Sequence, residues 1–363
     1  MVTLQRGFDL PHRLRKLGTV PIVTSSGVGA THSEFKVLAP GVVTGRYGTI
    51  GEVFFLQEDF WPLNTTLYVR DFHGNDPLFV SYLLRTIDFH THSGKSGVPG
   101  VNRNDLHDIG VVVPVAAAQQ CRIAEALSDA DALIESLEQL LAKKRQIKQG
   151  AMQELLTGRR RLPGFVSDWH VMRLAELADI RSGGTPSTSR AEFWAGEIPW
   201  CTPTDITALQ GGKYLQQTSR TVSALGLAAS SAELIPPGSI VMTSRASIGV
   251  CAINVVPLST NQGFKNFVPF ECVVGEFLYY LLTVQRQRFL NLCAGSTFLE
   301  IGKAQLVGYE VCLPVDKSEQ TAIATTLSDM DAELTALEAR VAKTRLLKQG
   351  MAQALLTGRI RLV

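Results

Sequence analysis

The chain has 363 residues, with 35 Lys plus Arg against 33 Asp plus Glu, and 45 % of its residues are hydrophobic. This length suffices for two or three domains, and the composition excludes a disordered chain and a strongly basic nucleic-acid coat protein. The first residues lack the apolar stretch of a signal peptide, and no run of 18 apolar residues predicts a membrane span. The six cysteines are dispersed without a CxxC pair, so we expect a reduced, cytoplasmic protein.

Residues 1–115 are predicted to form a first globular domain. The runs Val42–Gly45 and Gly110–Val113 favour strands, and Leu78–Leu84 favours a helix, so the predicted class is mixed α and β. The domain carries ten basic and ten acidic groups, so it is not basic overall. It appears shortened at its N-terminus relative to the second domain: we expect either a true start upstream of Met1 or a smaller domain class.

Residues 116–162 are predicted to form a long spacer helix. Pro114 stands just before it, and Gly158 follows its last apolar pair, as a C-terminal glycine does. Between them, apolar residues recur in alternating steps of four and three, which is the a/d seam of a coiled coil. These residues are Ile123, Leu127, Ala130, Ile134, Leu137 and Leu141.

Residues 163–315 are predicted to form a second globular domain that repeats landmarks of the first in the same order. Each has a Pro-Gly turn, an apolar strand, an arginine, small residues and Ile-Gly, which aligns Arg46 with Arg245. The second domain opens with Trp169–Ile180, for which the first has no counterpart. Between the landmarks the two sequences diverge, as expected for one scaffold with different surface loops.

Residues 316–363 are predicted to form a second long spacer helix, because they repeat the first at an offset of 200 residues. Residues 113–162 and 313–362 share 26 identities in 50 positions without a gap. Two near-identical helices can pair with each other, and an antiparallel pair would create a pseudo-twofold axis. The predicted fold is therefore α+β: two mixed α/β domains separated by two long helices that form an antiparallel coiled coil, in a circular arrangement.

Catalytic motifs are not found in the sequence. Gly94-Lys95-Ser96 resembles the end of a phosphate-binding loop, but Phe89 stands where its first glycine is required. His90 and His92 have no acidic or cysteine cluster beside them, so no metal site is predicted. We find no nucleotide-binding, hydrolase, methyltransferase or nuclease motif. The pattern favours a binding subunit that is not an enzyme and holds no cofactor.

Several motifs together resemble the specificity subunits of type I restriction–modification systems. In both helices the repeat includes the Gln, Leu-Ser-Asp and Leu-Leu-Thr-Gly-Arg elements, and each domain resembles one class of target recognition domain. The motifs are Gly7–Pro11, Gly45–Gly51 and Asn64–Tyr68 in the first domain, and Gly183–Pro186, Ile198–Trp200 and Asn261–Lys265 in the second. The resemblance covers nearly the whole chain.

The resemblance implies a non-catalytic subunit that reads a bipartite, asymmetric site in double-stranded DNA. Each domain would read one half-site, and the paired helices would set the spacing between them. Modification subunits, expected to be two and to carry S-adenosylmethionine, would methylate adenine at N6. A restriction–translocase subunit would join for cleavage. No membrane is involved in this picture.

Candidate DNA-contacting residues are polar or cationic side chains in the loops and strand ends of both domains. They are Ser25, Ser26, Arg46, Tyr47, Lys95, Ser96, Asn102, Arg103, Thr185, Thr204, Ser244, Arg245, Ser247, Lys265, Ser296, Thr297 and Lys303. For Arg46 and Arg245 two interpretations stay open: a side chain that reaches a base, or one that braces its loop. Trp200 is predicted to be a core residue.

Candidate partner-binding residues lie on the repeated helices: Gln120, Lys148, Gln320 and Lys348. The alternative function is a scaffold that does not bind DNA, in which a coiled coil holds two ligand-binding domains. The balanced charge of the domains favours that alternative, because DNA binding would need phosphate neutralisation from elsewhere.

Overall fold

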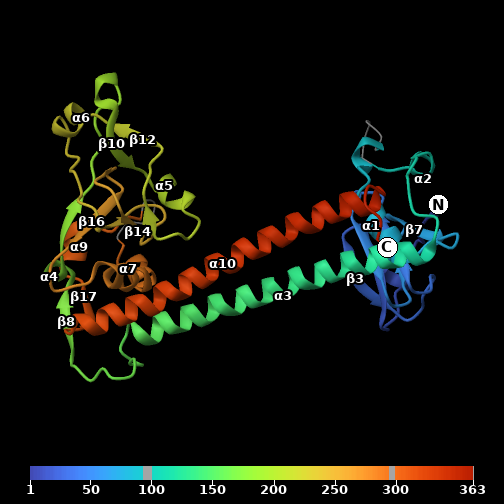
Figure 1. Ribbon diagram of the computed structural model, residues 1–363, viewed down its shortest axis with the longest axis horizontal. Helices are drawn as coiled ribbons and strands as arrows, with labels where there is room; N and C mark the ends of the chain where they lie inside the picture. Colours follow the sequence, from blue (N-terminus) through green and yellow to red (C-terminus); the bar gives the residue numbers. More distant parts are fainter. Residues whose placement is uncertain (93–99, 294–298, 363) are drawn as a thin grey trace. The chain divides into compact units, whose positions relative to one another are not determined.

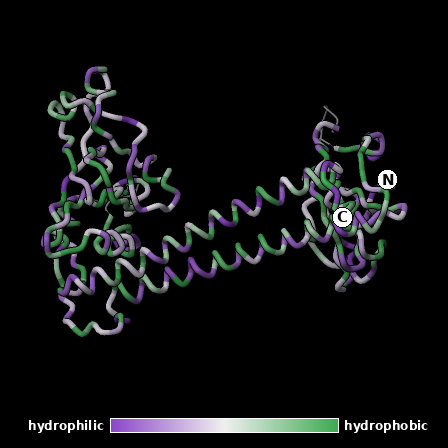
Figure 2. The backbone as a smooth tube through the Cα atoms, in the orientation of Figure 1, coloured by the Kyte–Doolittle hydropathy of each residue, from purple (hydrophilic) through white to green (hydrophobic). Residues whose placement is uncertain are grey.

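The two heptad-patterned repeats form two long α-helices. In the computed structural model, which describes residues 1–92, 100–293 and 299–362, α3 spans Ala117–Leu155 and α10 spans Lys317–Leu356. The predicted seam residues of both helices are buried or half-buried. Figure 2 shows apolar and polar residues alternating along both helices. None of the described helices is both long enough and apolar enough to cross a membrane.

The chain divides into two compact units, each of which contains one globular part and portions of both long helices (Figure 1). Unit 1 comprises Met1–Gln139 and Leu337–Val363, and unit 2 comprises Leu140–Ala336. Within each unit the two helix portions run antiparallel, as predicted. In unit 1 Arg345 pairs with Glu138 and Lys348 with Asp131. The predicted division into four segments at 115, 162 and 315 stays a prediction.

Unit 1 is built on a four-stranded antiparallel sheet in the order β1-β7-β4-β5, with a second sheet in the order β3-β2-β6. Helix α1 covers the first sheet, because Val80 and Leu84 pack against Val42 and Leu67. Its other elements have these bounds: β1 Thr3–Arg6, η1 His12–Leu14, β2 Val20–Thr24, β3 Gly27–His32, β4 Gly41–Gly45, β5 Val53–Leu56, β6 Trp61–Pro62, β7 Thr66–Asp71, α1 Pro77–Leu84, η2 Phe89–His92 and α2 Arg103–His107.

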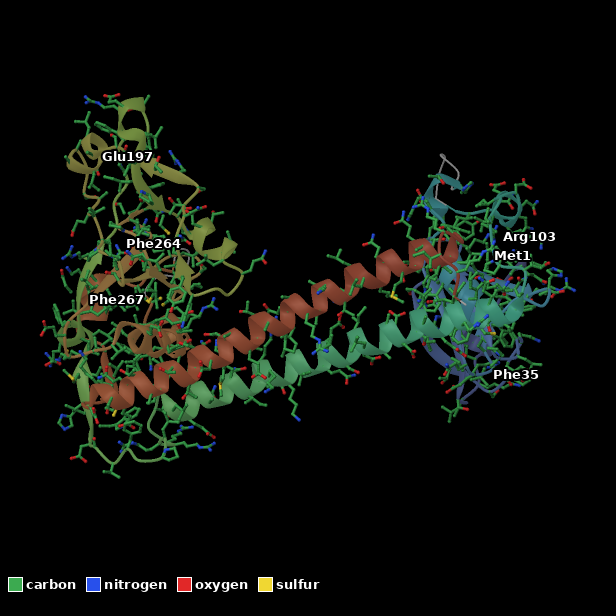
Figure 3. The ribbon with its side chains drawn as sticks, in the orientation of Figure 1. Met1, Phe35, Arg103, Glu197, Phe264 and Phe267 are labelled. Carbon is green, nitrogen blue, oxygen red and sulfur yellow. The ribbon has the colours of Figure 1, made fainter. Side chains whose placement is uncertain are left out.

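Unit 2 repeats this plan with a five-stranded sheet in the order β11-β14-β13-β16-β9, a β12-β10-β15 sheet and a β17-β8 ribbon. Phe264 and Phe267 of β16 are fully buried inside it (Figure 3). Its elements have these bounds: β8 Trp169–Arg173, α4 Leu174–Leu177, β9 Ala178–Ser182, η3 Ala191–Phe193, β10 Trp194–Cys201, α5 Pro203–Ala208, β11 Tyr214–Leu215, β12 Arg220–Val222, α6 Ala224–Ala228, β13 Ile240–Thr243, β14 Cys251–Asn254, β15 Ser259–Thr260, β16 Phe264–Pro269, α7 Gly275–Val284, α8 Arg286–Leu292, α9 Lys303–Val307 and β17 Glu310–Pro314.

One predicted strand is wrong. The apolar run Gly110–Val113 has no strand assignment, although its counterpart in the repeat is β17. The difference between the two runs lies in the neighbouring strand. Strand β17 is held by β8 in unit 2, whereas no described strand pairs with Gly110–Val113 in unit 1. A short apolar run becomes a strand only where a neighbour satisfies its backbone.

Candidate nucleic-acid interface

In each unit the loop after a central strand meets the residues that precede a short helix. In unit 1 the loop follows β4, and the Val101 amide donates to the Arg46 carbonyl at 3.0 Å. In unit 2 the loop follows β13, and the Ile301 amide donates to the Ser244 carbonyl at 3.1 Å. The junction therefore has the same backbone in both units, and its side chains differ.

This backbone match corrects the predicted alignment of the two arginines. Arg46 corresponds to Ser244, and Tyr47 corresponds to Arg245, because Tyr47 bridges to Gly100 as Arg245 bridges to Glu300. The sequence alignment was therefore shifted by one residue. It had matched Arg46 with Arg245 because each follows an apolar strand and precedes small residues. The Ile-Gly that closes each loop needs its glycine: Gly51 and Gly249 both have positive φ, 81° and 79°.

The unit 1 junction combines a braced arginine with an exposed aromatic ring. Arg46 Nε donates to the Val101 carbonyl at 3.3 Å, and its guanidinium lies 4.6 Å from the centre of the Tyr47 ring. These contacts favour the bracing interpretation of Arg46. Tyr47 lies directly over Gly100, where a Cβ would come within 2.1 Å of the ring. The ring is packed against Gly100 and the Arg46 guanidinium and is 36 % exposed.

The structure brings four other predicted unit 1 residues near this ring. Ser25 and Ser26 form the turn between β2 and β3, and a Cβ at Gly48 would lie 3.3 Å from Ser25 Oγ. Asn102 accepts from the Asn104 amide at 3.1 Å and so begins α2, while Arg103 is exposed on its first turn. This group gathers polar side chains of the turn after β2 and of the start of α2.

The unit 2 junction is a charge cluster. Arg245 Nε lies 2.9 Å from one carboxylate oxygen of Glu300, and Lys265 Nζ lies 3.9 Å from the other. The Glu300 carboxylate thus forms ion pairs with Arg245 and Lys265, two of the cations that were predicted to contact DNA. Sequence reasoning missed Glu300; the signal was an acidic residue standing three positions before the candidate Lys303.

Two predicted unit 2 contacts are corrected by their burial. The Lys265 side chain is only 7 % exposed, and burial lowers the pKa of its ammonium group because water no longer solvates the charge. Ser244 is fully buried, and its hydroxyl has no hydrogen-bond partner among the described residues. Neither side chain has a surface to offer to DNA in this conformation.

The remaining unit 2 candidates lie on or near the surface. Thr185 donates to the Gln262 side-chain carbonyl, and the Asn261–Gly263 turn adjoins the loop, because the Ser244 amide donates to the Gly263 carbonyl at 2.7 Å. Thr204 is exposed on α5, Ser247 is half-buried, and Lys303 is exposed at the start of α9. Lys95, Ser96, Ser296 and Thr297 lie outside the described residues.

Arg220 belongs to a further cation–aromatic group that sequence reasoning missed. Its guanidinium lies 3.9 Å from the centre of the Trp194 ring and 5.2 Å from that of Trp200. Trp200 is 4 % exposed, which confirms its predicted place in the core. No sequence spacing connects Arg220 to these tryptophans; pairing of β10 with β12 brings them together.

Gln120 and Gln320, for which partner binding stays a prediction, are both buried and hydrogen-bonded within the chain. Gln120 Nε2 donates to the Pro114 carbonyl at 2.8 Å, and its Oε1 accepts from the Asp76 amide at 2.9 Å. Gln320 donates to the Pro314 carbonyl at 2.9 Å and accepts from the Val274 amide at 2.8 Å. Each glutamine thus fastens the start of a long helix to the helix that covers the sheet.

Lys148 and Lys348, for which partner binding also stays a prediction, each belong to a matching internal group. Lys348 pairs with Asp131, which accepts from the Tyr82 hydroxyl at 2.8 Å. Lys148 pairs with Asp331, which accepts from the Tyr280 hydroxyl at 2.5 Å. We call each group a Tyr–Asp–Lys triad. The lysines are the polar continuation of the apolar seam, and their charges are used inside each unit.

The described residues contain no cluster of His, Cys, Asp and Glu able to hold a metal ion. The raised pKa values at the triads have a structural cause: burial, and then the hydrogen bond to Asp131, raise the pKa of Tyr82 to about 12. The two junctions carry exposed donors and acceptors, one half-exposed aromatic ring and one carboxylate–guanidinium pair.

Comparison with known proteins agrees with this organisation. The specificity subunit of the MjaIX type I restriction enzyme from Methanocaldococcus jannaschii is 39 % identical over 166 residues, covering 45 % of this chain and 38 % of that protein. The EcoprrI specificity subunit from Escherichia coli is 32 % identical over 134 residues, covering 36 % and 32 %. The matched regions thus span less than half the length of these curated relatives.

Likeness to a solved structure concerns the fold alone. The type I restriction-modification S subunit from M. genitalium matches with a TM-score of 0.61 and 16 % identity, over 98 % of this chain and 93 % of that one. The model of the type I restriction modification DNA specificity domain matches residues 8–148 and 166–345. The chain therefore belongs to the family of type I restriction modification DNA specificity domains.

Proposed function

We propose that this chain is the specificity subunit of a type I restriction–modification complex. In this role each unit reads one half of a bipartite, asymmetric site in double-stranded DNA. The chain itself carries out no chemistry; it directs adenine-N6 methylation and restriction by partner subunits. Since the target is chromosomal and incoming DNA, the complex works in the cytoplasm.

The observation that carries the proposal is one backbone junction presenting different side chains in two units. Tyr47 stands over Gly100 in unit 1, while Arg245 meets Glu300 at the same place in unit 2. Base edges in the major groove are distinguished by patterns of donors and acceptors. A constant scaffold with an aromatic edge in one unit and a guanidinium–carboxylate pair in the other is suited to reading two unlike half-sites.

Partner subunits are part of the proposal because the chain supplies little positive potential of its own. Its net charge is +2, and Arg245 and Lys265 already face Glu300. Phosphate neutralisation dominates affinity for DNA, so much of it has to come from other subunits. We propose two modification subunits, which carry S-adenosylmethionine and methylate adenine, together with a restriction–translocase subunit.

The decisive experiment is base-resolved mapping of adenine methylation in a strain that carries the modification subunit. The gene is compared intact, deleted, and restored as an Arg245→Ala variant. A split methylated motif should disappear on deletion and return on complementation. The Arg245→Ala variant should relax recognition in one half-site and leave the other half unchanged.

Identical methylation maps with and without the gene would contradict the proposal. In that case the alternative, a coiled-coil scaffold with two ligand-binding domains, takes its place. A motif that changes in both halves in the Arg245→Ala variant would contradict the assignment of one half-site to each unit. The matched control is Arg361→Ala, an exposed arginine far in sequence from both junctions, which should leave the motif intact.

A further inference from the structure

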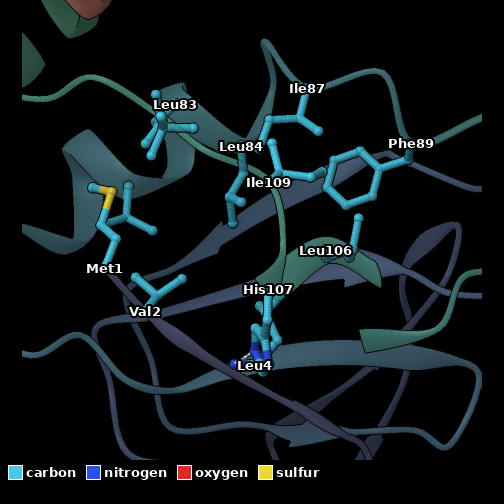
Figure 4. A pocket seen from close by; sticks show the side chains of 12 residues that line it. Met1, Val2, Leu4, Leu83, Leu84, Ile87, Phe89, Leu106, His107 and Ile109 are labelled. Carbon is cyan, nitrogen blue, oxygen red and sulfur yellow. Dashed lines mark hydrogen bonds between the residues drawn. The ribbon is translucent and has the colours of Figure 1, made fainter. Parts of the chain in front are cut away.

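The cavity beside α1 and α2 in unit 1 is lined almost wholly by apolar side chains (Figure 4). Its volume is about 80 Å³, and Leu4, Leu84 and Leu106 are among its walls. The His107 ring reaches it too, and its Nε2 accepts a hydrogen bond from the Leu4 amide at 2.9 Å. Apolar walls cannot donate to or accept from the edge of a base, so the groups able to recognise DNA are the exposed polar ones.

An exposed guanidinium in unit 2 lies against aromatic rings and has no acidic partner. Arg220 stands on β12, with its guanidinium 3.9 Å from the centre of the Trp194 ring and 5.2 Å from that of Trp200. Among the described residues, no Asp or Glu forms an ion pair with Arg220, whereas Arg245 is paired with Glu300. The charge and the N–H donors of Arg220 are therefore available to a ligand.

The surroundings of Arg220 hold this guanidinium in place. A guanidinium that packs on an aromatic ring keeps the N–H donors around its edge free, and these donors form a rigid fork. The Trp194 ring is fixed in turn, because its Nε1 donates to the Ser187 carbonyl at 3.1 Å and the ring meets Trp200 edge-on. The Thr218 hydroxyl donates to the Arg220 carbonyl at 2.7 Å and holds the backbone. A fork that is already oriented loses less conformational entropy when it binds.

The rings that hold this guanidinium are connected to the unit 2 junction by short contacts. Trp200 Nε1 donates to the Gly184 carbonyl at 3.1 Å, and the following residue, Thr185, donates to the Gln262 side chain. The turn that contains Gln262 is hydrogen-bonded to the residue before Arg245, as described above. The free guanidinium and the loop that carries Arg245 therefore belong to one connected group within unit 2.

Unit 1 has an alanine at the position that matches Arg220. Strand β2 runs parallel to β6 as β10 runs parallel to β15, and this pairing matches Ile22 with Trp200. The next residue of each strand accepts from the first amide after the parallel partner strand, at 2.9 Å in unit 1 and 3.0 Å in unit 2. Ile22 is opposite Ala30 on β3, and Trp200 is opposite Arg220 on β12. A contact with the common DNA backbone would serve both half-sites alike, whereas this residue belongs to unit 2.

We propose that Arg220 is a specificity-determining residue of unit 2, which donates two hydrogen bonds to a single guanine in the major groove. This inference rests on the proposed function and names a residue and a base for it. Guanine presents its O6 and N7 acceptors side by side in the major groove, and a guanidinium fork matches them. Trp194 is the positioning residue, because its ring holds the fork. A phosphate also presents paired oxygens, so the experiment has to separate the two acceptors.

The test measures binding of the full chain, assembled with its modification subunits, to duplexes that carry the methylated motif. Each guanine of the motif is replaced in turn by 7-deazaguanine, which lacks the N7 acceptor and keeps its base pair. In the parent complex one replacement should weaken binding about fivefold or more, because part of a bidentate contact is lost. Arg220→Met keeps an unbranched side chain on the rings and removes the donors, so the same replacement should then change affinity less than about twofold.

The matched control is Arg173→Met, the same change at an exposed arginine on the β8–β17 ribbon of unit 2. It should respond to every replacement as the parent does. Trp194→Leu should reduce the response at the one guanine and leave the responses at the other guanines unchanged, which a purely structural role of the ring would not produce. Urea unfolding checks that each variant is folded, and Arg220→Gln is the second variant if Arg220→Met is not.

Two results would overturn this inference and leave the proposed function standing. The first is a parent complex that recognises its motif and a folded Arg220→Met complex that responds to every replacement as the parent does. The second is an affinity of Arg220→Met that falls equally for all duplexes, with a shallower salt dependence, which would assign Arg220 to a phosphate. A parent complex with no preferred motif would contradict the proposed function itself, and the assignment of Arg220 with it.

Discussion

Unit 1 and unit 2 share a sheet, a covering helix and a junction loop, yet they differ in how the sheet domain is joined to the long helices. Both joints contain a buried glutamine and a Tyr–Asp–Lys triad. Among the described residues, β8–α4 and the buried Glu319–Arg161 pair belong to unit 2. The comparison teaches that the glutamine and the triad are the repeated contacts of the joint, while the buried ion pair distinguishes the joint of unit 2.

The largest difference between the units is expected at the buried ion pair. Arg161→Ala leaves the Glu319 carboxylate, which is 0 % exposed, without its cation. Removing the cation in this way is strongly destabilising, because it leaves an uncompensated charge on a buried carboxylate. Urea unfolding, followed by hydrogen exchange at the start of α10, measures the loss. Arg361→Ala, at the matching exposed position of unit 1, should change stability by less than about 0.5 kcal/mol. If Arg161→Ala and Arg361→Ala lowered the free energy of unfolding equally, the ion pair would not distinguish the two joints.

The two Tyr–Asp–Lys triads test how similar the two units are. Tyr82→Phe and Tyr280→Phe each remove a hydrogen bond to a carboxylate, which contributes about 1.5–3 kcal/mol. The two losses should agree within a factor of two, although the Tyr280 hydroxyl also lies 3.3 Å from Ser328 Oγ. Urea unfolding at neutral pH measures both. A loss of stability in only one of the two variants would show that the two triads do not stabilise their units equally.

The Tyr82 triad also predicts a dependence on pH. Burial raises the pKa of Tyr82 from 10 to about 12 in the folded state. A raised folded pKa stabilises the protonated form, so this contribution is complete below pH 10 and is lost as the pH rises through 12. Unfolding measured between pH 9 and about 12 should show this loss in the parent chain. Tyr82→Phe should lack that part of the slope; an unchanged slope would contradict the assignment.

A smaller effect is expected at the matching valines. Val311→Ala removes buried apolar surface worth about 1.6 kcal/mol, at roughly 0.8 kcal/mol per methylene-sized group. Val111→Ala should cost less, roughly 1 kcal/mol on the same scale, because Val111 is 36 % exposed. The difference is read from urea midpoints.

The smallest effect is expected at the unit 2 junction. Glu300→Gln removes the carboxylate that faces Arg245 and Lys265, so non-specific DNA affinity of the assembled complex should rise about fivefold, roughly 1 kcal/mol. The salt dependence should steepen by about one charge. Glu310→Gln, an exposed carboxylate in the same unit, is the control. If the DNA affinity did not rise, or rose equally in Glu310→Gln, Glu300 would not be what restrains the two cations at the junction.

Long, periodic features could be predicted from the sequence, and contacts between distant segments could not. The seam from Ile123 to Leu141 identified both helices because heptad spacing is local. Gln120 and Lys148 were also found by repetition, but repetition does not tell an internal contact from a docking surface. Their partners, the Asp76 amide and Asp331, are brought near only by the fold.

Prediction of the candidate interface from the sequence was limited for the same reason. Arg46 and Arg245 look equivalent in sequence, yet backbone pairing with residues 100–101 and 300–301 sets the true match. The burial of Lys265 follows from its place on β16 between β13 and β9. Gly110–Val113 has the composition of a strand, and whether it becomes one depends on a neighbour that local sequence does not contain.

Each long helix carries its aspartate early and its lysine late: Asp131 and Lys148 in α3, Asp331 and Lys348 in α10. A helix ordered in this way is complementary to a reversed copy of itself. Duplication of a single ancestral gene segment would therefore have produced a matched pair at once, with no need for two different sequences to adapt to each other. Afterwards the two helices are bound to change in step, because a substitution in either aspartate breaks a contact that the other copy supplies.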